Sequence, residues 1–166
     1  MLNHFARGRV SGRGLILAAA LAASTAVVSS ANAGECPADQ RKPNAREAST
    51  LPGKDVTDTV LAAIDLANEP IKADGRQMRV RKLVVQPGGI VPWHSHDNRP
   101  AMIYIVSGEV LEYASNCAAP IAHKAGDVAS EKAGISHWWQ NAGNAPVVLI
   151  SVDLFPVANM KDQHMM

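Results

Sequence analysis

Two histidines stand one residue apart in the stretch PWHSHDNRPA, which runs from Pro92 to Ala101. Residues i and i+2 of a β-strand point to the same face of the sheet, so His94 and His96 would project side by side. Imidazole nitrogens are frequent ligands of Zn, Fe and Cu, and two of them on one strand form half of a metal site. Because such pairs also occur by chance, this pair alone does not establish a metal site.

Arg99 follows three residues after His96 and precedes Pro100, whose ring favours a bend in the backbone at this point. Beside a metal, its guanidinium could hold a substrate carboxylate through two parallel hydrogen bonds. The alternative interpretation is a structural ion pair with a nearby acid such as Asp97 or Glu112.

Short strand-like runs separated by turn residues must position these side chains. The turns are indicated by Gln86-Pro-Gly-Gly89, by Ser107-Gly108 and by Lys124-Ala-Gly-Asp127. Strands are predicted over residues 79–85, 90–96, 102–106, 109–114, 134–140 and 146–153. This spacing indicates an all-β sandwich or barrel. Residues 59–66 are apolar and compatible with either a strand or a helix.

The polar segment before these strands contains Pro37, Pro43 and Pro52 and shows little apolar periodicity. It is typical of an extended arm or loop. We therefore expect an irregular N-terminal arm over residues 34–56, a β-barrel over residues 57–157 and a polar C-terminal tail over residues 158–166.

Residues 1–33 have the pattern of a secretory signal peptide. Arg7, Arg9 and Arg13 precede a mostly apolar run from Leu15 to Val28, and Ala31-Asn-Ala33 forms a small-residue cleavage site. The alternative, a membrane anchor, is disfavoured because this apolar run is too short to span a bilayer. We expect cleavage after Ala33, a periplasmic or secreted protein, and no membrane span after cleavage.

Removing residues 1–33 takes away three of the 16 basic residues and none of the 15 acidic ones. The remaining chain is mildly acidic and has no basic cluster, which argues against nucleic acid as a partner. Its two cysteines, Cys36 and Cys117, could form a disulfide in an oxidising compartment. The alternatives are two unpaired thiols or a bridge to another chain.

Eight spaced residues carry a resemblance to a known family. Gly88, His94, His96 and Gly108 match the pattern G-x5-H-x-H-x(3,4)-E-x6-G, and Gly126, Gly134, His137 and Asn141 match G-x5-P-x-G-x2-H-x3-N. These are the two motifs of the cupin superfamily, which the chain resembles over roughly residues 59–156. The resemblance implies a small jelly-roll barrel, also called a double-stranded β-helix. Lys132 replaces the proline of the second motif, and Ala101 replaces the glutamate of the first.

The resemblance implies that His137 joins His94 and His96 around a metal ion. Without a carboxylate at Ala101, we expect a three-histidine site for one divalent transition metal, with Fe, Zn or Cu preferred over Mn. Trp139 would face inward with His137, where it either lines a ligand pocket or packs in the core. His123 has no motif position and is predicted to lie on a hairpin or at the rim.

Two interpretations of function remain open. Glutamate-free cupin sites resemble those of some dioxygenases, which implies an oxygenase-type oxidoreductase acting on a small polar or anionic substrate. The alternative is a non-enzymatic cupin that binds a small-molecule ligand or a metal, and a domain with a vacant site is a third interpretation. A homodimer is compatible with exposed apolar strand faces, but no sequence feature decides between a dimer and a monomer.

Overall fold

The computed structural model describes residues 34–158. The predicted signal peptide and residues 159–166 of the predicted tail lie outside the described residues. The described part consists of eight strands and one 3-10 turn, η1: η1 Ala38–Gln40, β1 Lys54–Asp65, β2 Arg76–Ser95, β3 Ala101–Ser107, β4 Glu109–Ala114, β5 Ile121–Lys124, β6 Val128–Glu131, β7 Ser136–Gln140 and β8 Val147–Pro156. Within the predicted arm, residues 34–53 contain η1 and no named strand, and residues 54–56 already belong to β1.

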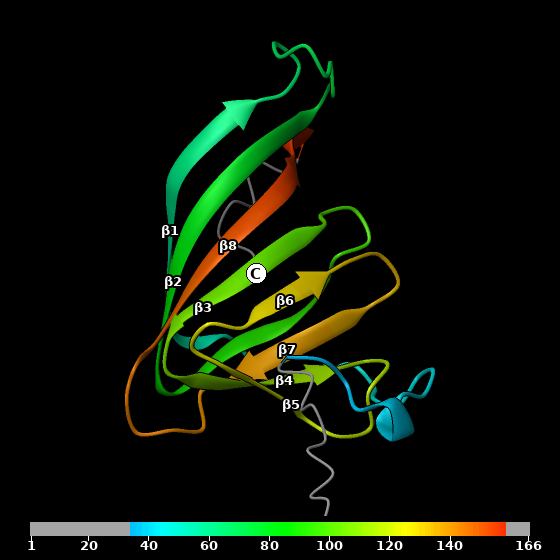
Figure 1. Ribbon diagram of the computed structural model, residues 1–166, viewed down its shortest axis with the longest axis vertical. Helices are drawn as coiled ribbons and strands as arrows, with labels where there is room; N and C mark the ends of the chain where they lie inside the picture. The colour runs from blue at the N-terminus through cyan, green and yellow to red at the C-terminus, as the bar shows by residue number, and fades with distance from the viewer. Residues whose placement is uncertain (1–33, 159–166) are drawn as a thin grey trace, which may run out of the picture. The chain divides into compact units, whose positions relative to one another are not determined.

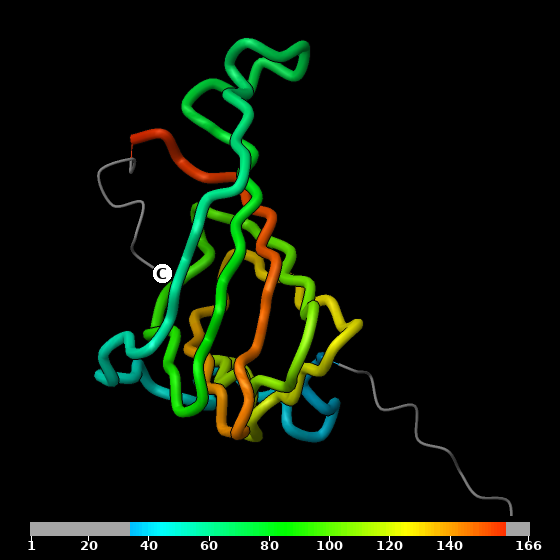
Figure 2. Tube along the Cα trace, turned by 90° about the vertical axis from the view of Figure 1, so that its left-hand side faces the viewer, coloured from blue at the N-terminus to red at the C-terminus, as the bar shows by residue number. Residues whose placement is uncertain are grey.

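All strand pairs are antiparallel, and the strands follow the order β5-β4-β7-β2-β8-β3-β6, with β1 paired to β2. The sheet curls so that β4, β5 and β7 face β3, β6 and β8 across the interior (Figure 1). Seen from the side, β1, β2, β8 and β3 lie next to one another (Figure 2). The prediction of an all-β jelly-roll barrel is confirmed.

Strand β2 connects the two halves of the barrel. Its first half pairs with β8 through residues 76–85, and its last residues, from Ile90 to Ser95, pair with β7. The prediction of a turn at Gln86–Gly89 is wrong, because the strand continues through this segment. Gly88 has a φ of 74°, a left-handed conformation that glycine adopts without steric cost, so the strand bends here but does not end.

Residues 59–66, for which a helix was one option, belong almost entirely to β1. This strand begins at Lys54, three residues before the predicted start of the barrel, and pairs with β2 from Ile90 back to Gln77. These apolar residues form an outer strand of the sheet. Pairing with β2 satisfies the backbone hydrogen-bonding groups along one edge of this strand.

Alternating residues of the strands form the core between the two halves of the barrel. The largest cluster of buried side chains comprises Leu83, Val85, Val91, Ala101, Ile103, Ile105, Val110, Ala129, Trp139, Val147 and Leu149. Gly108 closes the turn between β3 and β4 with a φ of 83°, and a Cβ atom there would lie 2.9 Å from Val147 Cγ2. The motif glycine is therefore required by both the backbone conformation and the packing.

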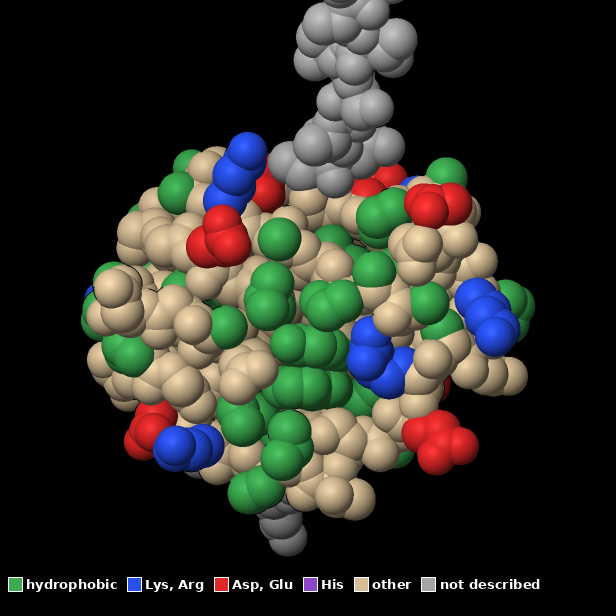
Figure 3. Space-filling view, turned by 90° about the horizontal axis from the view of Figure 1, so that it is seen from below, with side chains coloured by type: hydrophobic (Ala, Val, Ile, Leu, Met, Phe, Trp, Pro, Cys, Tyr) green, Lys and Arg blue, Asp and Glu red, His purple; other side chains and the backbone are tan. Residues whose placement is uncertain are grey.

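On the lower face of the molecule, hydrophobic side chains gather in the middle and charged side chains stand mainly around them (Figure 3). Strand β4 lies at this end of the barrel (Figure 1). There Tyr113 of β4 and Trp138 of β7 stack with ring centres 4.0 Å apart, and the Arg46 guanidinium of the arm lies 5.1 Å from the Tyr113 ring. The arm thus packs against the barrel through an aromatic contact.

Candidate metal centre

Four side chains form a cluster that can hold a metal ion. His94 lies at the end of β2, His96 directly follows that strand, Glu131 ends β6, and His137 lies in β7. One ligand atom from each residue lies within 4.8 Å of the ligand atoms of the other three. We call these four residues the metal cluster.

The Nε2 atoms of the three histidines point toward a common centre. His94 Nε2 lies 3.2 Å from His137 Nε2, and His96 Nε2 lies 2.6 Å from Glu131 Oε2. The other carboxylate oxygen of Glu131 is 3.4 Å from His137 Nε2. Three nitrogens and a carboxylate therefore face one small volume, and this donor set suits a divalent transition metal.

The Nδ1 atoms of the same histidines point outward to hydrogen-bond acceptors. His94 Nδ1 lies 2.9 Å from the carbonyl of Pro92, and His96 Nδ1 lies 2.7 Å from the carbonyl of Arg99. His137 Nδ1 lies 2.6 Å from Glu112 Oε1. A carbonyl oxygen can only accept, so His94 and His96 carry their protons on Nδ1, and the carboxylate favours the same tautomer in His137.

This tautomer leaves a lone pair on each inward-facing Nε2. Within residues 34–158, the buried Nε2 of His96 has no hydrogen-bond partner with acceptable geometry. His94 Nε2 and His137 Nε2 are close enough to share one cation, either a proton or a metal ion. Together with the unpartnered Nε2 of His96 and the carboxylate of Glu131, these nitrogens fit a bound metal ion.

Glu131 corrects the prediction of a three-histidine site. Ala101 is directly opposite Glu131 in the ladder between β3 and β6, so the carboxylate absent from the first motif is supplied by the neighbouring strand. The preference for Fe, Zn or Cu over Mn depended on the absence of a carboxylate and no longer holds. Glu131 was missed because it stands one residue before the motif position of Lys132, and only the strand register places it beside Ala101.

Glu112 of β4 is a second carboxylate that the sequence did not reveal as part of the site. It contacts His137 through Oε1 and His123 Nε2 through Oε2, at 2.8 Å for the latter. His123 was predicted at the rim, but it is fully buried and stacks on Trp139 with ring centres 4.7 Å apart. Glu112 thus fixes the orientation of a cluster histidine from outside the cluster.

The charges of the site shift the pKa values of its groups in opposite directions. Burial lowers the pKa of His94 well below its usual value, and the neighbouring His137 lowers it further. Burial also acts to lower the pKa of His137, but the carboxylates of Glu131 and Glu112 outweigh it, so this pKa is raised. Burial alone would raise the pKa of Glu112, yet hydrogen bonds from His123 and His137 bring it down to about 2.

A cavity of about 360 Å³ opens beside the metal cluster. Its floor includes His96, Glu131 and His137, and Glu112 also lines it. The residues of the N-terminal arm from Gly34 to Cys36, together with Arg41, line the same cavity. A volume of this size accommodates a small ligand.

The two residues predicted to contact substrate have other neighbours than this cavity, and their role at a substrate stays a prediction. Arg99 is 9% exposed and has Nη1 3.7 Å from Oδ2 of Asp153, an acid that the sequence analysis did not consider as its partner. The same carboxylate receives two hydrogen bonds from Arg79. Trp139 is buried and lines a void of about 20 Å³ with His94, among others, on the barrel side of the cluster. In the described part of the chain, neither Arg99 nor Trp139 is among the residues that line the cavity of about 360 Å³.

The structure joins Cys36 and Cys117 in a disulfide with a Cα–Cα distance of 5.8 Å. This bond connects the arm to the turn after β4. It closes a loop of 81 residues in sequence, which limits the conformations of the unfolded chain.

Comparison with known proteins agrees with this architecture. Residues 81–153 match the model of the Cupin domain family, a range that includes both motifs and most of β8. Over these residues the chain is similar to that family.

Individual relatives are more distant. The 11S globulin seed storage protein Ana o 2.0101 of Anacardium occidentale is 30% identical over 105 residues, which are 48% of this chain and 22% of that protein. The chain thus spans about a fifth of the length of this relative. A Klebsiella pneumoniae structure with a double-stranded β-helix domain is 23% identical with a TM-score of 0.49, over 60% of this chain and 76% of that chain. The cupin domain of Schizosaccharomyces pombe Cnp3 is 14% identical with a TM-score of 0.49, over 70% and 72%.

Among residues 34–158, no helix has the length and apolar character needed to cross a membrane.

Proposed function

We propose that this protein is a metal-dependent oxidoreductase of the oxygenase type, which acts on a small polar or anionic substrate. The observation that carries this proposal is the convergence of three histidine Nε2 atoms and the Glu131 carboxylate on one point beside a cavity of about 360 Å³. His94, His96, Glu131 and His137 would hold the metal, and an ion that prefers more than four ligands would accept exogenous ones as well. A bound metal would supply Lewis acidity and, if it is iron, electrons for dioxygen chemistry.

The chain's own residues hold and orient the cluster. The carbonyls of Pro92 and Arg99 and the carboxylate of Glu112 fix the three imidazole rings through their Nδ1 atoms. Glu131 contributes one negative charge, so a divalent ion in the cluster retains a net positive charge and attracts an anionic ligand. The cavity is the route by which such a ligand reaches the cluster.

The experiment is metal analysis of the purified full chain, followed by oxygen uptake with iron-loaded protein and a panel of hydroxyacids and diketones. Bound metal that is lost in a His94→Ala/His137→Ala variant, together with substrate-dependent oxygen uptake, supports the proposal. A wild-type protein that takes up neither iron, manganese, zinc nor copper contradicts it.

A non-enzymatic metal-binding protein is the second candidate. The observation that favours it is the fourth protein ligand, because structural zinc sites are usually closed by four protein donors. Tightly bound zinc with tetrahedral coordination in X-ray absorption spectra, and no turnover with any metal, would support this candidate over an oxidoreductase.

We also propose that the protein is exported to the periplasm or secreted. The Cys36–Cys117 disulfide supports an oxidising compartment. Cleavage after Ala33 would make Gly34 the first residue of the mature protein, directly at the wall of the cavity. Cell fractionation and N-terminal sequencing test this, and an intact N-terminus in the cytoplasm contradicts it.

A homodimer is our proposal for the outer face of β1, β2, β8, β3 and β6. Large apolar side chains are exposed there on neighbouring strands: Ile64, Met78, Met102, Tyr104, Val128, Val152 and Leu154. A face with so few charges is complementary to a copy of itself across a two-fold axis, and isolated proteins seldom expose such large patches. Light scattering should give twice the monomer mass, and Met102→Lys should reduce it to the monomer mass.

A further inference from the structure

The N-terminal arm covers one side of the ligand cavity. Its residues Gly34, Glu35, Cys36 and Arg41 line the cavity opposite the metal cluster. We call the segment Gly34–Arg41 the arm wall. The ligand site is therefore built from two parts of the chain that lie more than 50 residues apart in sequence.

Gly34 lies directly against His123, which is fully buried. A Cβ atom at Gly34 would lie 2.8 Å from His123 Nδ1, and the residue has a φ of 82°. This Nδ1 atom has no hydrogen-bond partner within the described residues, although the other ring nitrogen contacts Glu112. The arm wall thus covers His123, which is the first member of a series of contacting side chains that continues through Glu112 to His137.

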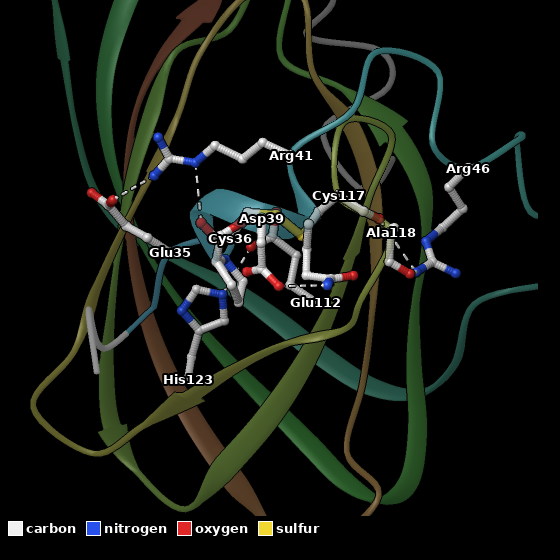
Figure 4. Close-up of a disulfide and its surroundings, with 11 residues drawn as sticks. Glu35, Cys36, Asp39, Arg41, Arg46, Glu112, Cys117, Ala118 and His123 are labelled. Carbon is white, nitrogen blue, oxygen red and sulfur yellow. Dashed lines mark hydrogen bonds and ion pairs between the residues drawn. A yellow bond between two sulfur atoms is a disulfide. The ribbon is translucent and has the colours of Figure 1, made fainter. Parts of the chain in front are cut away.

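The disulfide is what connects the first part of the arm wall to the barrel. Gln40 and Lys42 are held by backbone hydrogen bonds with Ala118 and Asn116, at 2.9 and 3.0 Å. For Gly34 to Cys36, the only bond to the barrel found in residues 34–158 is the Cys36–Cys117 disulfide. Figure 4 shows Cys36 beside His123 and the ion pair between Glu35 and Arg41 nearby.

The charges at the rim indicate the class of ligand. Arg41 donates from Nε to the carbonyl of Cys36 and from Nη2 to Glu35, both at 3.1 Å, so its guanidinium is held at the cavity. Lys132 also lines the cavity, and no ion pair of it is found within residues 34–158. The cavity lining thus carries two cations, Arg41 and Lys132, and three carboxylates, Glu35, Glu112 and Glu131. A divalent ion in the metal cluster would make the sum of these charges positive, which favours a small anion with oxygen donors.

We propose that the arm wall completes the ligand site and that the Cys36–Cys117 disulfide holds it closed, so that the oxidised protein binds a small dianion tightly and the reduced protein binds it weakly. The inference rests on the proposed function, because the dianion binds between the metal and Arg41. A wall fixed before binding lowers the entropy lost on binding, and releasing it removes this advantage.

The first experiment measures binding of oxalate to the zinc-loaded full chain by calorimetry, with metal content checked afterwards. Oxalate is a small dicarboxylate that can reach a metal and a guanidinium together, and zinc is not redox-active. We expect the Cys36→Ser/Cys117→Ser variant to retain zinc but to bind oxalate about tenfold more weakly. Oxalate affinity within about twofold of wild type would overturn the proposal.

Reduction of the wild-type protein provides the same test without mutation. A phosphine reductant transfers two electrons to the disulfide, two thiols form with protons from water, and the phosphine becomes a phosphine oxide with the oxygen of that water. We expect the same loss of oxalate affinity, reversed on reoxidation. An unchanged affinity after complete reduction overturns the proposal.

Substitutions in the arm wall keep the disulfide intact and test its position and charge. Gly34→Ala places a methyl group against His123 and should weaken oxalate binding, whereas Gly75→Ala, with a similar φ of 69° and no atoms within 4 Å, should not. Arg41→Gln should weaken binding about tenfold, whereas Lys42→Gln, which removes the same charge outside the cavity, should have little effect. The proposal would be contradicted if Gly34→Ala and Gly75→Ala weakened oxalate binding equally, or if Arg41→Gln and Lys42→Gln did so.

A second readout does not depend on metal. Diethyl pyrocarbonate modifies accessible imidazoles, and peptide mass spectrometry locates the modified histidine. His123 should be unreactive in the oxidised protein and become reactive in the Cys36→Ser/Cys117→Ser variant. If wild type takes up no metal, the proposed function fails, while reactivity of His123 still decides whether the disulfide holds the wall. An unreactive His123 in both proteins shows that it does not.

Discussion

Ala101 and Glu131 are directly opposite each other on β3 and β6, and the Glu131 carboxylate lies 2.6 Å from His96 Nε2. Directly opposed residues in an antiparallel ladder have Cβ atoms about 5 Å apart, so a glutamate at either position can reach the same point. The carboxylate that the first motif would place at position 101 is thus matched by one on the neighbouring strand. The following predictions test this arrangement and its surroundings.

Moving the carboxylate back to β3 should restore a lost metal site. Glu131→Ala removes one of four ligands, and we expect metal affinity to fall about 100-fold, since even outer partners of ligands contribute 10–100-fold. The Ala101→Glu/Glu131→Ala double variant should recover most of that loss. Competition with a chromogenic chelator measures the affinities. A double variant as weak as Glu131→Ala would show that the two positions are not equivalent.

Glu112 should strengthen metal binding without contacting the metal. Glu112→Gln keeps the size of the side chain but removes the charge that faces the Nδ1 proton of His137. We expect about 10–100-fold weaker metal binding with the fold retained. Chelator competition gives the affinity, and near-ultraviolet circular dichroism checks the fold. Glu109→Gln, on the exposed start of β4, is the matched control and should leave the affinity unchanged.

Metal affinity should depend on pH through His137. A proton on His137 Nε2 competes with the metal, and the pKa of His137 is raised above its ordinary value of 6.5. Metal affinity should therefore rise with pH through 6.5 and level off only above that raised pKa. The pKa of His94 is lowered, so His94 does not compete in this range. Affinities measured from pH 5.5 to 8.5 check this, and a plateau already reached at pH 6 would be inconsistent with it.

Arg99 should contribute to stability and not to ligand binding. Arg99→Met removes a guanidinium that faces the buried Asp153 carboxylate, while the Arg79 hydrogen bonds to that carboxylate remain. We expect the free energy of unfolding to decrease by about 1–3 kcal/mol. Urea denaturation of the metal-free protein measures this change. Oxalate affinity should be unchanged, and a large loss of affinity with unaltered stability would instead support a substrate contact for Arg99.

Local sequence patterns predicted β3, β4, β7 and β8 and both halves of β2, because alternation and turn residues are local properties. They did not distinguish a strand from a helix at β1, they did not give β5 and β6 as strands, and they placed a turn where β2 continues. The motif spacing likewise placed His94, His96 and His137 in one site. Glu131 and Glu112 escaped prediction because their roles depend on which strands are neighbours, which is not encoded at a fixed sequence spacing. The acidic partner of Arg99 was missed for a related reason: Asp153 lies 54 residues away on β8, beyond the nearby acids considered.

Strand β2 also imposes a strict constraint on insertions and deletions. It carries the buried Arg79 and Arg81 before the bend at Gly88 and the cluster histidine His94 after it. Because side chains alternate between the two faces of a strand, one inserted residue near Gly88 would turn either the arginines or His94 toward solvent. The number of residues in the bend around Gly88 therefore determines which side chains of β2 face the interior of the barrel.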